Sequence, residues 1–157
     1  MSYVRPTTKD LALARELGRG RFATALAVNG HAVKRITGAA ATQEMRLVRE
    51  GTRRLQNAGV AVLPIIDQWA EGNSVYYVQP LAPPPETWTD EQVEQGIKLA
   101  DAAFQAGVTD VLPHNVGLDG DGNLVVIDPG ELCDPEDEDD QMYQGDVLWN
   151  WGIVMDD

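Results

Sequence analysis

The second half of the chain carries three oxygen-bearing side chains at short intervals. Asp110 and Asn115 are five residues apart, and Asp128 follows thirteen residues after Asn115. Apolar residues between Asn115 and Asp128 predict a β-hairpin, which would bring its two ends together. Carboxylate and amide oxygens suit Mg²⁺, whose coordination is usually completed by phosphate oxygens, and a carboxylate can also accept a hydroxyl proton. This half therefore predicts a convergent site for Mg²⁺ or for a hydroxyl group.

A pair of glycines and one lysine in the first half could contact a phosphate. Gly18 and Gly20 lie in an expected turn between two strands, where a backbone without Cβ atoms can approach an anion closely. Lys34 follows fourteen residues after Gly20, inside an otherwise apolar strand. Taken singly, a glycine pair is more often a plain hairpin turn, and a lysine within a strand more often faces solvent. Their succession along the chain is what favours a phosphate site.

Apolar patterning assigns these residues to strands around one helix. Alternating apolar residues predict strands over 10–36, interrupted at 29–30 by an Asn-Gly pair that predicts a type I′ hairpin turn. Apolar residues at helical spacing predict a helix over 41–57. Two more strands are expected over 60–69 and 75–78. The first half is thus expected to form a five-stranded antiparallel sheet with one helix.

Prolines separate this half from a second half that is expected to be helical. Pro80 and Pro83–Pro85 predict a stiff, extended connector. A threonine followed three residues later by a glutamine forms a capping-box pattern, which predicts a helix over 89–106. The acidic run 134–140 is expected to be a solvated loop, and 142–155 a closing helix. The four tryptophans are expected to pack in the core.

Charge is distributed unevenly along the 157 residues. The net charge is −13, but the chain through Arg54 has eleven basic and four acidic residues, whereas the remainder has one basic residue, Lys98, and 21 acidic ones. The acidic half should repel nucleic acid and could attract a basic partner or divalent cations. The single cysteine cannot form an internal disulfide, and the sequence shows no signal peptide and no membrane span. A cytoplasmic protein is expected, in a host cytoplasm if the gene belongs to a phage or encodes an effector.

The order of these features resembles the protein kinase-like superfamily over nearly the whole chain. A glycine-rich loop, a strand lysine, a helix acid and a hinge are followed by an Asp-x-x-x-x-Asn loop, a hairpin and an Asp-x-Gly motif. The resemblance implies an α+β, protein kinase-like fold with a five-stranded antiparallel N-lobe sheet, one N-lobe helix and a reduced helical C-lobe. It implies a single domain, with an N-lobe over about 1–80, a hinge over about 79–87 and a truncated C-lobe over about 88–157.

The resemblance also implies which residues of the first half bind ATP. Gly18 and Gly20 would cover the phosphates, and Lys34 would pair with the α- and β-phosphates. The adenine would lie against the segment that includes Val78 and Leu81.

A helix acid is expected to hold Lys34 in position. Glu44 lies on the apolar stripe of the expected helix and is favoured for this role, whereas Glu50 lies off that stripe and remains the alternative.

In the second half, the resemblance implies that Asp110 accepts the proton of the substrate hydroxyl, while Asn115 and Asp128 hold Mg²⁺. The implied function is a minimal ATP- and Mg²⁺-dependent phosphotransferase that acts on protein Ser or Thr hydroxyls.

Several departures from the family pattern support an alternative function. Ala23 replaces a third loop glycine, Leu112 replaces a basic residue after the catalytic aspartate, and no peptide-docking segment follows Asp128-Pro129-Gly130. The alternative is a catalytically weak pseudokinase, or an acidic binding module that docks on a basic partner protein and inhibits it.

Overall fold

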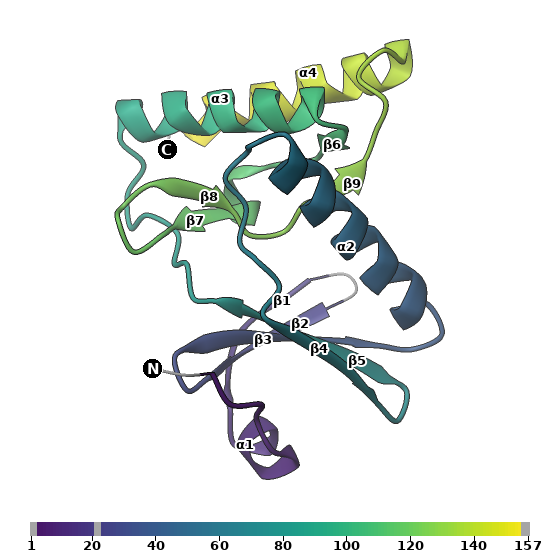
Figure 1. The fold of residues 1–157 in the computed structure, drawn as a ribbon. Helices are drawn as coiled ribbons and strands as arrows, with labels where there is room; N and C mark the ends of the chain where they lie inside the picture. Colours follow the sequence, from purple (N-terminus) through teal and green to yellow (C-terminus); the bar gives the residue numbers. More distant parts are fainter. Residues whose placement is uncertain (1–2, 21–22, 155–157) are drawn as a thin grey trace. The chain divides into compact units, whose positions relative to one another are not determined.

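The computed structural model describes residues 3–20 and 23–154. The chain divides into two compact units, of which the first comprises 1–46 and 64–81 and the second comprises 47–63 and 82–157 (Figure 1). Helix α2 (Ala41–Asn57) begins in the first unit and ends in the second. The described residues form an α+β structure with four α-helices, none of which is long and apolar enough to span a membrane.

The first unit is built on a five-stranded antiparallel sheet, as the sequence predicts. Its strands lie in the order β1 (Arg15–Arg19), β2 (Ala23–Val28), β3 (His31–Thr37), β5 (Ser74–Pro80) and β4 (Asp67–Glu71). The predicted Asn-Gly turn joins β2 to β3, and both of its residues have positive φ, 50° at Asn29 and 82° at Gly30. Because each turn residue adopts the conformation that a tight hairpin needs, β2 and β3 pair in register along their length.

The prediction of strand structure from residue 10 onward is wrong at its start. Residues Thr8–Ala12 form helix α1 instead. The Thr7 side chain accepts from the Asp10 backbone N–H while the Asp10 side chain accepts from the Thr7 backbone N–H, so a capping box starts the helix. Leu11 packs against the core of the first unit, but Leu13, just after the helix, is 77% exposed.

The strand predicted over 60–69 is also much shorter than expected. Strand β4 begins only at Asp67. Before it, the chain makes a single isolated bridge between Val62 and Val126. Leu63 still donates its N–H to the Val126 carbonyl, but Pro64 after it has no backbone N–H to donate, which prevents a longer ladder.

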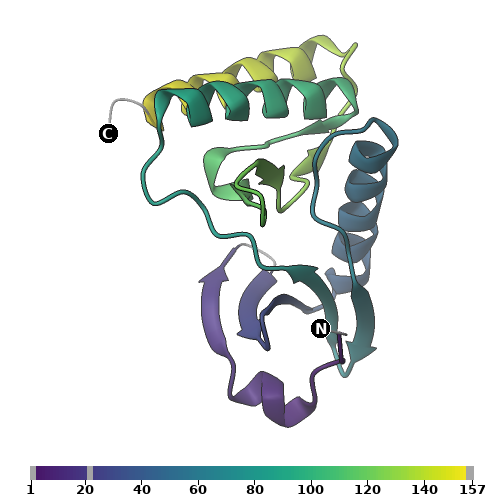
Figure 2. The same cartoon turned by 60° about the vertical axis from the view of Figure 1, so that its left-hand side comes forward.

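The second unit contains the C-terminal part of α2, two further α-helices and two short two-stranded sheets. Helices α3 (Asp90–Gln105) and α4 (Glu138–Val154) run alongside each other in opposite directions, as both views show (Figures 1 and 2). The capping box predicted for α3 is present between Thr89 and Gln92. The hairpin of β7 (Val116–Leu118) and β8 (Leu124–Val126) completes the core, and β6 (Val108–Thr109) pairs with β9 (Glu131–Leu132).

The acidic run predicted as a loop is in part helical. Residues 138–140 form the first turn of α4. The Asp137 carboxylate accepts from the backbone N–H groups of Asp139 and Asp140, and negative charge is favourable at a helix N-terminus. The tryptophan prediction is wrong for Trp149, which is 71% exposed, whereas Trp151 is fully buried.

Packing between α3 and α4 depends on a glycine. A Cβ atom at Gly96 would lie 2.1 Å from the Trp151 ring, which is too close for any real contact. We expect Gly96→Ala to lower the free energy of unfolding by about 1–3 kcal/mol, because the buried indole must shift. Gly145→Ala in α4 is the matched control: its Cβ would meet nothing within 4 Å, and better helix propensity should stabilise the protein by about 0.5–1 kcal/mol. Urea denaturation measures both, and equal effects would contradict this account of the packing.

Candidate functional site

The candidate site of the second unit is centred on Asp110, whose backbone is unusual. Its φ is 64°, a left-handed conformation that residues other than glycine seldom adopt. The Asn115 side chain donates from Nδ2 to the Asp110 carbonyl oxygen over 2.9 Å. Asn115 is buried at the end of the 3-10 helix η1 (Pro113–Asn115). The structure therefore brings together the first two residues that the sequence predicts for this site.

Asp128 joins them through the backbone of the β7–β8 hairpin. The Asn115 carbonyl accepts from the Ile127 N–H over 2.8 Å and from the Asp128 N–H over 3.4 Å. Asp128 lies two residues after the end of β8, and its Oδ1 accepts from the Gly130 N–H over 3.1 Å. The predicted convergence of Asp110, Asn115 and Asp128 is thus present within one unit, and Asn115 contacts both of the others.

The Asp128-Pro129-Gly130 motif fits closely against its surroundings. Pro129 is fully buried, and a Cβ atom at Gly51 of α2 would lie 2.7 Å from it. Gly130 has a φ of 69°, and a Cβ atom there would lie 2.3 Å from the Thr109 carbonyl oxygen. The absence of a side chain at Gly130 allows the motif to approach the residue that precedes Asp110.

Helix α4 holds the three consecutive residues 109–111 by one hydrogen bond each. The Thr109 hydroxyl donates to Gln144 over 2.8 Å, and Trp151 Nε1 donates to the Val111 carbonyl over 2.9 Å. Between them, the Tyr143 hydroxyl donates to Oδ1 of Asp110 over 2.6 Å. These contacts raise the pKa of Tyr143 to about 12, first through the hydrogen bond to Asp110 and then through burial and nearby carboxylates.

Tyr143 is a residue of this site that the sequence does not predict. Thirty-three residues separate it from Asp110, and no motif joins them. A helix that covers the loop could have been anticipated from the apolar run of α4, but not which of its residues faces Asp110.

The second unit offers oxygen ligands of the type that Mg²⁺ prefers, from two residues. Asn115 uses Nδ2 for Asp110, which leaves Oδ1 as a ligand, and Asp128 supplies carboxylate oxygens. These are the hard oxygen ligands that Mg²⁺ takes, and two protein ligands suffice when phosphate and water complete the octahedron. Within 3–20 and 23–154, no three His, Cys, Asp or Glu side chains form a group that could hold a metal.

In the first unit, Lys34 lies on the sheet face opposite an apolar cluster formed by Leu26, Val28, Val33 and Val78. Val33 and Val78 are register partners and are fully buried in that cluster, so Lys34 and its partner Tyr77 point to the other face. Lys34 is only 9% exposed, and its Nζ lies 5.6 Å from the centre of the Tyr77 ring. Its other register partner, Ala25, has a small side chain.

The glycine pair lies at the end of β1. Pairing with β2 is irregular between Glu16 and Gly18, and Gly20 donates its N–H to the Ala23 carbonyl over 2.8 Å. A Cβ atom at Gly18 would meet nothing within 4 Å, so the backbone is open at this point. Arg21 and Phe22, which follow Gly20, lie outside the described residues.

The two residues expected beside the adenine differ in environment. The Val78 side chain is committed to the apolar cluster on the face away from Lys34. Leu81, directly after β5, is 41% exposed. Pro80, which was expected to begin the extended connector, is instead the last residue of β5 and pairs with His31.

Of the two candidate acids on α2, Glu50 already has partners. It accepts hydrogen bonds from Arg53 and Arg54, which lower its pKa. Glu44 lies in the first turn of α2 and is half-buried. A role of either acid beside Lys34 stays a prediction.

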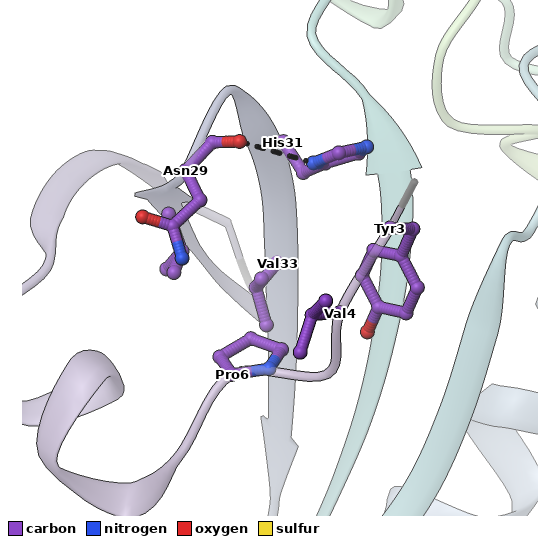
Figure 3. Close-up of a pocket in the computed structure, with 7 residues that line it drawn as sticks. Tyr3, Val4, Pro6, Asn29, His31 and Val33 are labelled. Atoms are coloured by element: carbon purple, nitrogen blue, oxygen red, sulfur yellow. Dashed lines mark hydrogen bonds between the residues drawn. The ribbon is translucent and has the colours of Figure 1, made fainter. Parts of the chain in front are cut away.

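The first unit has a hollow of about 390 Å³ whose lining includes none of the predicted site residues. Tyr3, Val4 and Pro6 face the β2–β3 hairpin across it, where His31 Nδ1 donates to the Asn29 carbonyl over 3.3 Å (Figure 3). Its lining is largely apolar and carries no carboxylate or lysine. This chemistry offers nothing for a phosphate, so the hollow is not part of the candidate site.

No protein-family model matches the chain, and no curated protein matches it.

The close approach of Gly130 to Thr109 predicts that one added methyl group strongly destabilises the protein. We expect Gly130→Ala to lower the free energy of unfolding by about 2–4 kcal/mol, because it combines a left-handed backbone with an overlap against Thr109. Gly122→Ala is the matched control, since Gly122 also has positive φ but nothing lies within 4 Å of its Cβ position. It should cost about 1–2 kcal/mol. Chemical denaturation compares the two, and equal losses would show that the close approach is unimportant.

The hydrogen bond between Tyr143 and Asp110 makes a prediction about titration. Asp110→Asn should lower the pKa of Tyr143 from about 12 toward 10, because a neutral amide no longer disfavours the phenolate. Asparagine tolerates positive φ, so the backbone should be retained. NMR of ¹³C-labelled tyrosine, assigned with Tyr143→Phe, measures the shift. Asp146→Asn should lower the pKa less, because Asp146 acts only through its charge. An unchanged pKa in Asp110→Asn would mean that the hydrogen bond does not form in solution.

Proposed function

We propose that the protein is a minimal, protein kinase-like phosphotransferase that uses ATP and Mg²⁺ and acts on protein Ser or Thr hydroxyls. The observation that carries this proposal is the joint fixation of Asp110, Asn115 and Asp128 within one unit. A general base and two oxygen ligands for a metal are the groups that phosphoryl transfer requires, since catalysis depends on positioning and on charge stabilisation.

In this proposal each residue has a separate task. Asp110 orients the acceptor hydroxyl and takes its proton. Asn115 and Asp128 would hold Mg²⁺, which when bound neutralises charge on the phosphates. Lys34 would bind the α- and β-phosphates, and Gly18 and Gly20 would let the backbone at the end of β1 approach them.

The surroundings of Lys34 are consistent with a nucleotide-binding role. Its register partner Ala25, and Ala27 and Ala32 on the same sheet face, carry only methyl side chains. Small side chains at these positions would let a flat ring system approach the sheet, and Leu81 offers exposed apolar surface beyond β5. Glu44 would position the lysine rather than stabilise the fold, since a buried ion pair gains little net free energy.

Leu112 implies slow transfer. It stands two residues after Asp110, where the resemblance expects a cation that stabilises charge on the moving phosphoryl group. Without that cation, turnover below that of a full protein kinase is expected even when nucleotide binding is intact.

A second candidate function is an acidic binding module for a basic partner protein. Met142, Trp149 and Ile153 leave a row of exposed apolar side chains along α4, beside the carboxylates that begin the helix. A basic segment with apolar anchors would complement this surface in charge and in hydrophobicity.

Calorimetry and labelled-phosphate transfer test the first function together. ATP with Mg²⁺ should bind the unaltered protein, and Lys34→Ala should weaken binding about tenfold or more, since it removes a charge-assisted contact to phosphate. Asp110→Asn should keep binding but lower transfer to casein by about 10²-fold or more. Lys98→Ala is the control, because this exposed lysine of α3 pairs only with Glu94 among its described contacts.

The outcomes separate the two candidate functions. Binding without any transfer would favour the pseudokinase form of the alternative. Absence of ATP binding in the unaltered protein would refute the phosphotransferase and leave the acidic binding module.

A further inference from the structure

Tyr143 has the geometry of an acceptor group at the proposed general base. Its hydroxyl donates to Oδ1 of Asp110 over 2.6 Å. A base must lie about 2.6–3.2 Å from the atom whose proton it takes, and Asp110 meets this condition for Tyr143. The Tyr143 side chain is 42% exposed, so a phosphate donor could reach its oxygen from solvent.

Both partners of this hydrogen bond are fixed from behind. Asp110 is held by Asn115 through its carbonyl oxygen. Tyr143 lies on α4 directly before Gln144, which is buried and bonded both to Thr109 and to the Ala100 carbonyl. The contact is therefore set by two anchored elements of one unit, unlike a chance pairing of two flexible surface side chains.

We propose that Tyr143 is an intramolecular phosphorylation site of this protein, with Asp110 as its base. This inference rests on the proposed phosphotransferase function and adds a phenolic acceptor within the chain itself. In the step, the Tyr143 oxygen forms a bond to the γ-phosphorus of ATP while the bond from that phosphorus to the β,γ-bridging oxygen breaks. The phenolic proton passes to Asp110, and ADP leaves with the electron pair of the broken bond.

The charges around Tyr143 indicate what the modification would do. Asp110, Glu131 and Asp146 all act on this side chain. A phosphate group adds a charge of about −1.5 to −2 and is repelled by nearby carboxylates. Phosphotyrosine at 143 would therefore leave Asp110, and the base would become available to an external acceptor. Tyr143 would act as both first substrate and removable block.

Mass spectrometry of the full chain after incubation with ATP and Mg²⁺ tests this proposal. One phosphate per chain is expected, located on Tyr143 by fragmentation, at a rate that does not change with protein concentration. Tyr143→Phe should lose this phosphate, and Asp110→Asn should slow its appearance about 10²-fold or more. Circular dichroism and ATP calorimetry on both variants check that they fold and bind.

Tyr3→Phe is the matched control. Tyr3 also donates to a carboxylate, Asp67, over 2.8 Å, and its pKa is likewise raised to about 12, but Asp67 is no proposed base. This variant should incorporate phosphate as the unaltered protein does.

Three results would overturn the proposal. Transfer to casein without phosphate on Tyr143 would refute it while leaving the phosphotransferase function intact. A rate proportional to protein concentration would show transfer between molecules. Absence of ATP binding would refute the phosphotransferase, and this inference with it.

Discussion

The left-handed backbone of Asp110 is the constraint on which the candidate site depends. An aspartate in this conformation persists only when its surroundings stabilise it more than the strain costs. Here the Asn115 side chain holds its carbonyl, and α4 binds the residue before it, the residue itself and the residue after it. The carboxylate direction is thus fixed by several contacts, none of which depends on the first unit.

Helix α4 accounts for how so short a chain can hold such a loop. One face carries Gln144 and Trp151, which reach the loop by hydrogen bonds, and the Trp151 ring packs over Gly96 and edge-on to Trp88. A buried indole uses its N–H as well as its apolar area here, so one residue supports both the core and the loop. Trp149 lies on the opposite face of α4 and is exposed.

Features with a local cause could be predicted from the sequence. The Asn-Gly turn and the capping box of α3 depend on residues at most three apart, and both are present. The convergence around Asn115 was predictable because a hairpin must bring its ends together. Helix α1 and the start of α4 were missed because side chains of Asp10 and Asp137 cap the backbone locally, an effect that apolar periodicity does not register.

The contacts that single out Tyr143 could not be predicted. They depend on the rotational phase of α4 relative to a loop 33 residues earlier, and the apolar residues of α4 are distributed around the helix. The positive φ of Asp110 could not be predicted either, because the residue is not a glycine, the type that usually indicates this conformation. Both features arise from tertiary packing, which overrides local preference. By contrast, the residue types at 110, 115 and 128 suffice to indicate the chemistry.

The division of the chain has a consequence for synthesis on the ribosome. Each unit is assembled from two stretches separated in sequence. β3 pairs with β5 although the whole of α2 lies between them along the chain. An emerging chain therefore cannot complete its sheet until residue 80 has left the exit tunnel, and no single cut in the gene separates the two units with both of them intact. Long-range strand pairing of this kind slows folding, so early intermediates would expose the unpaired edge of β3.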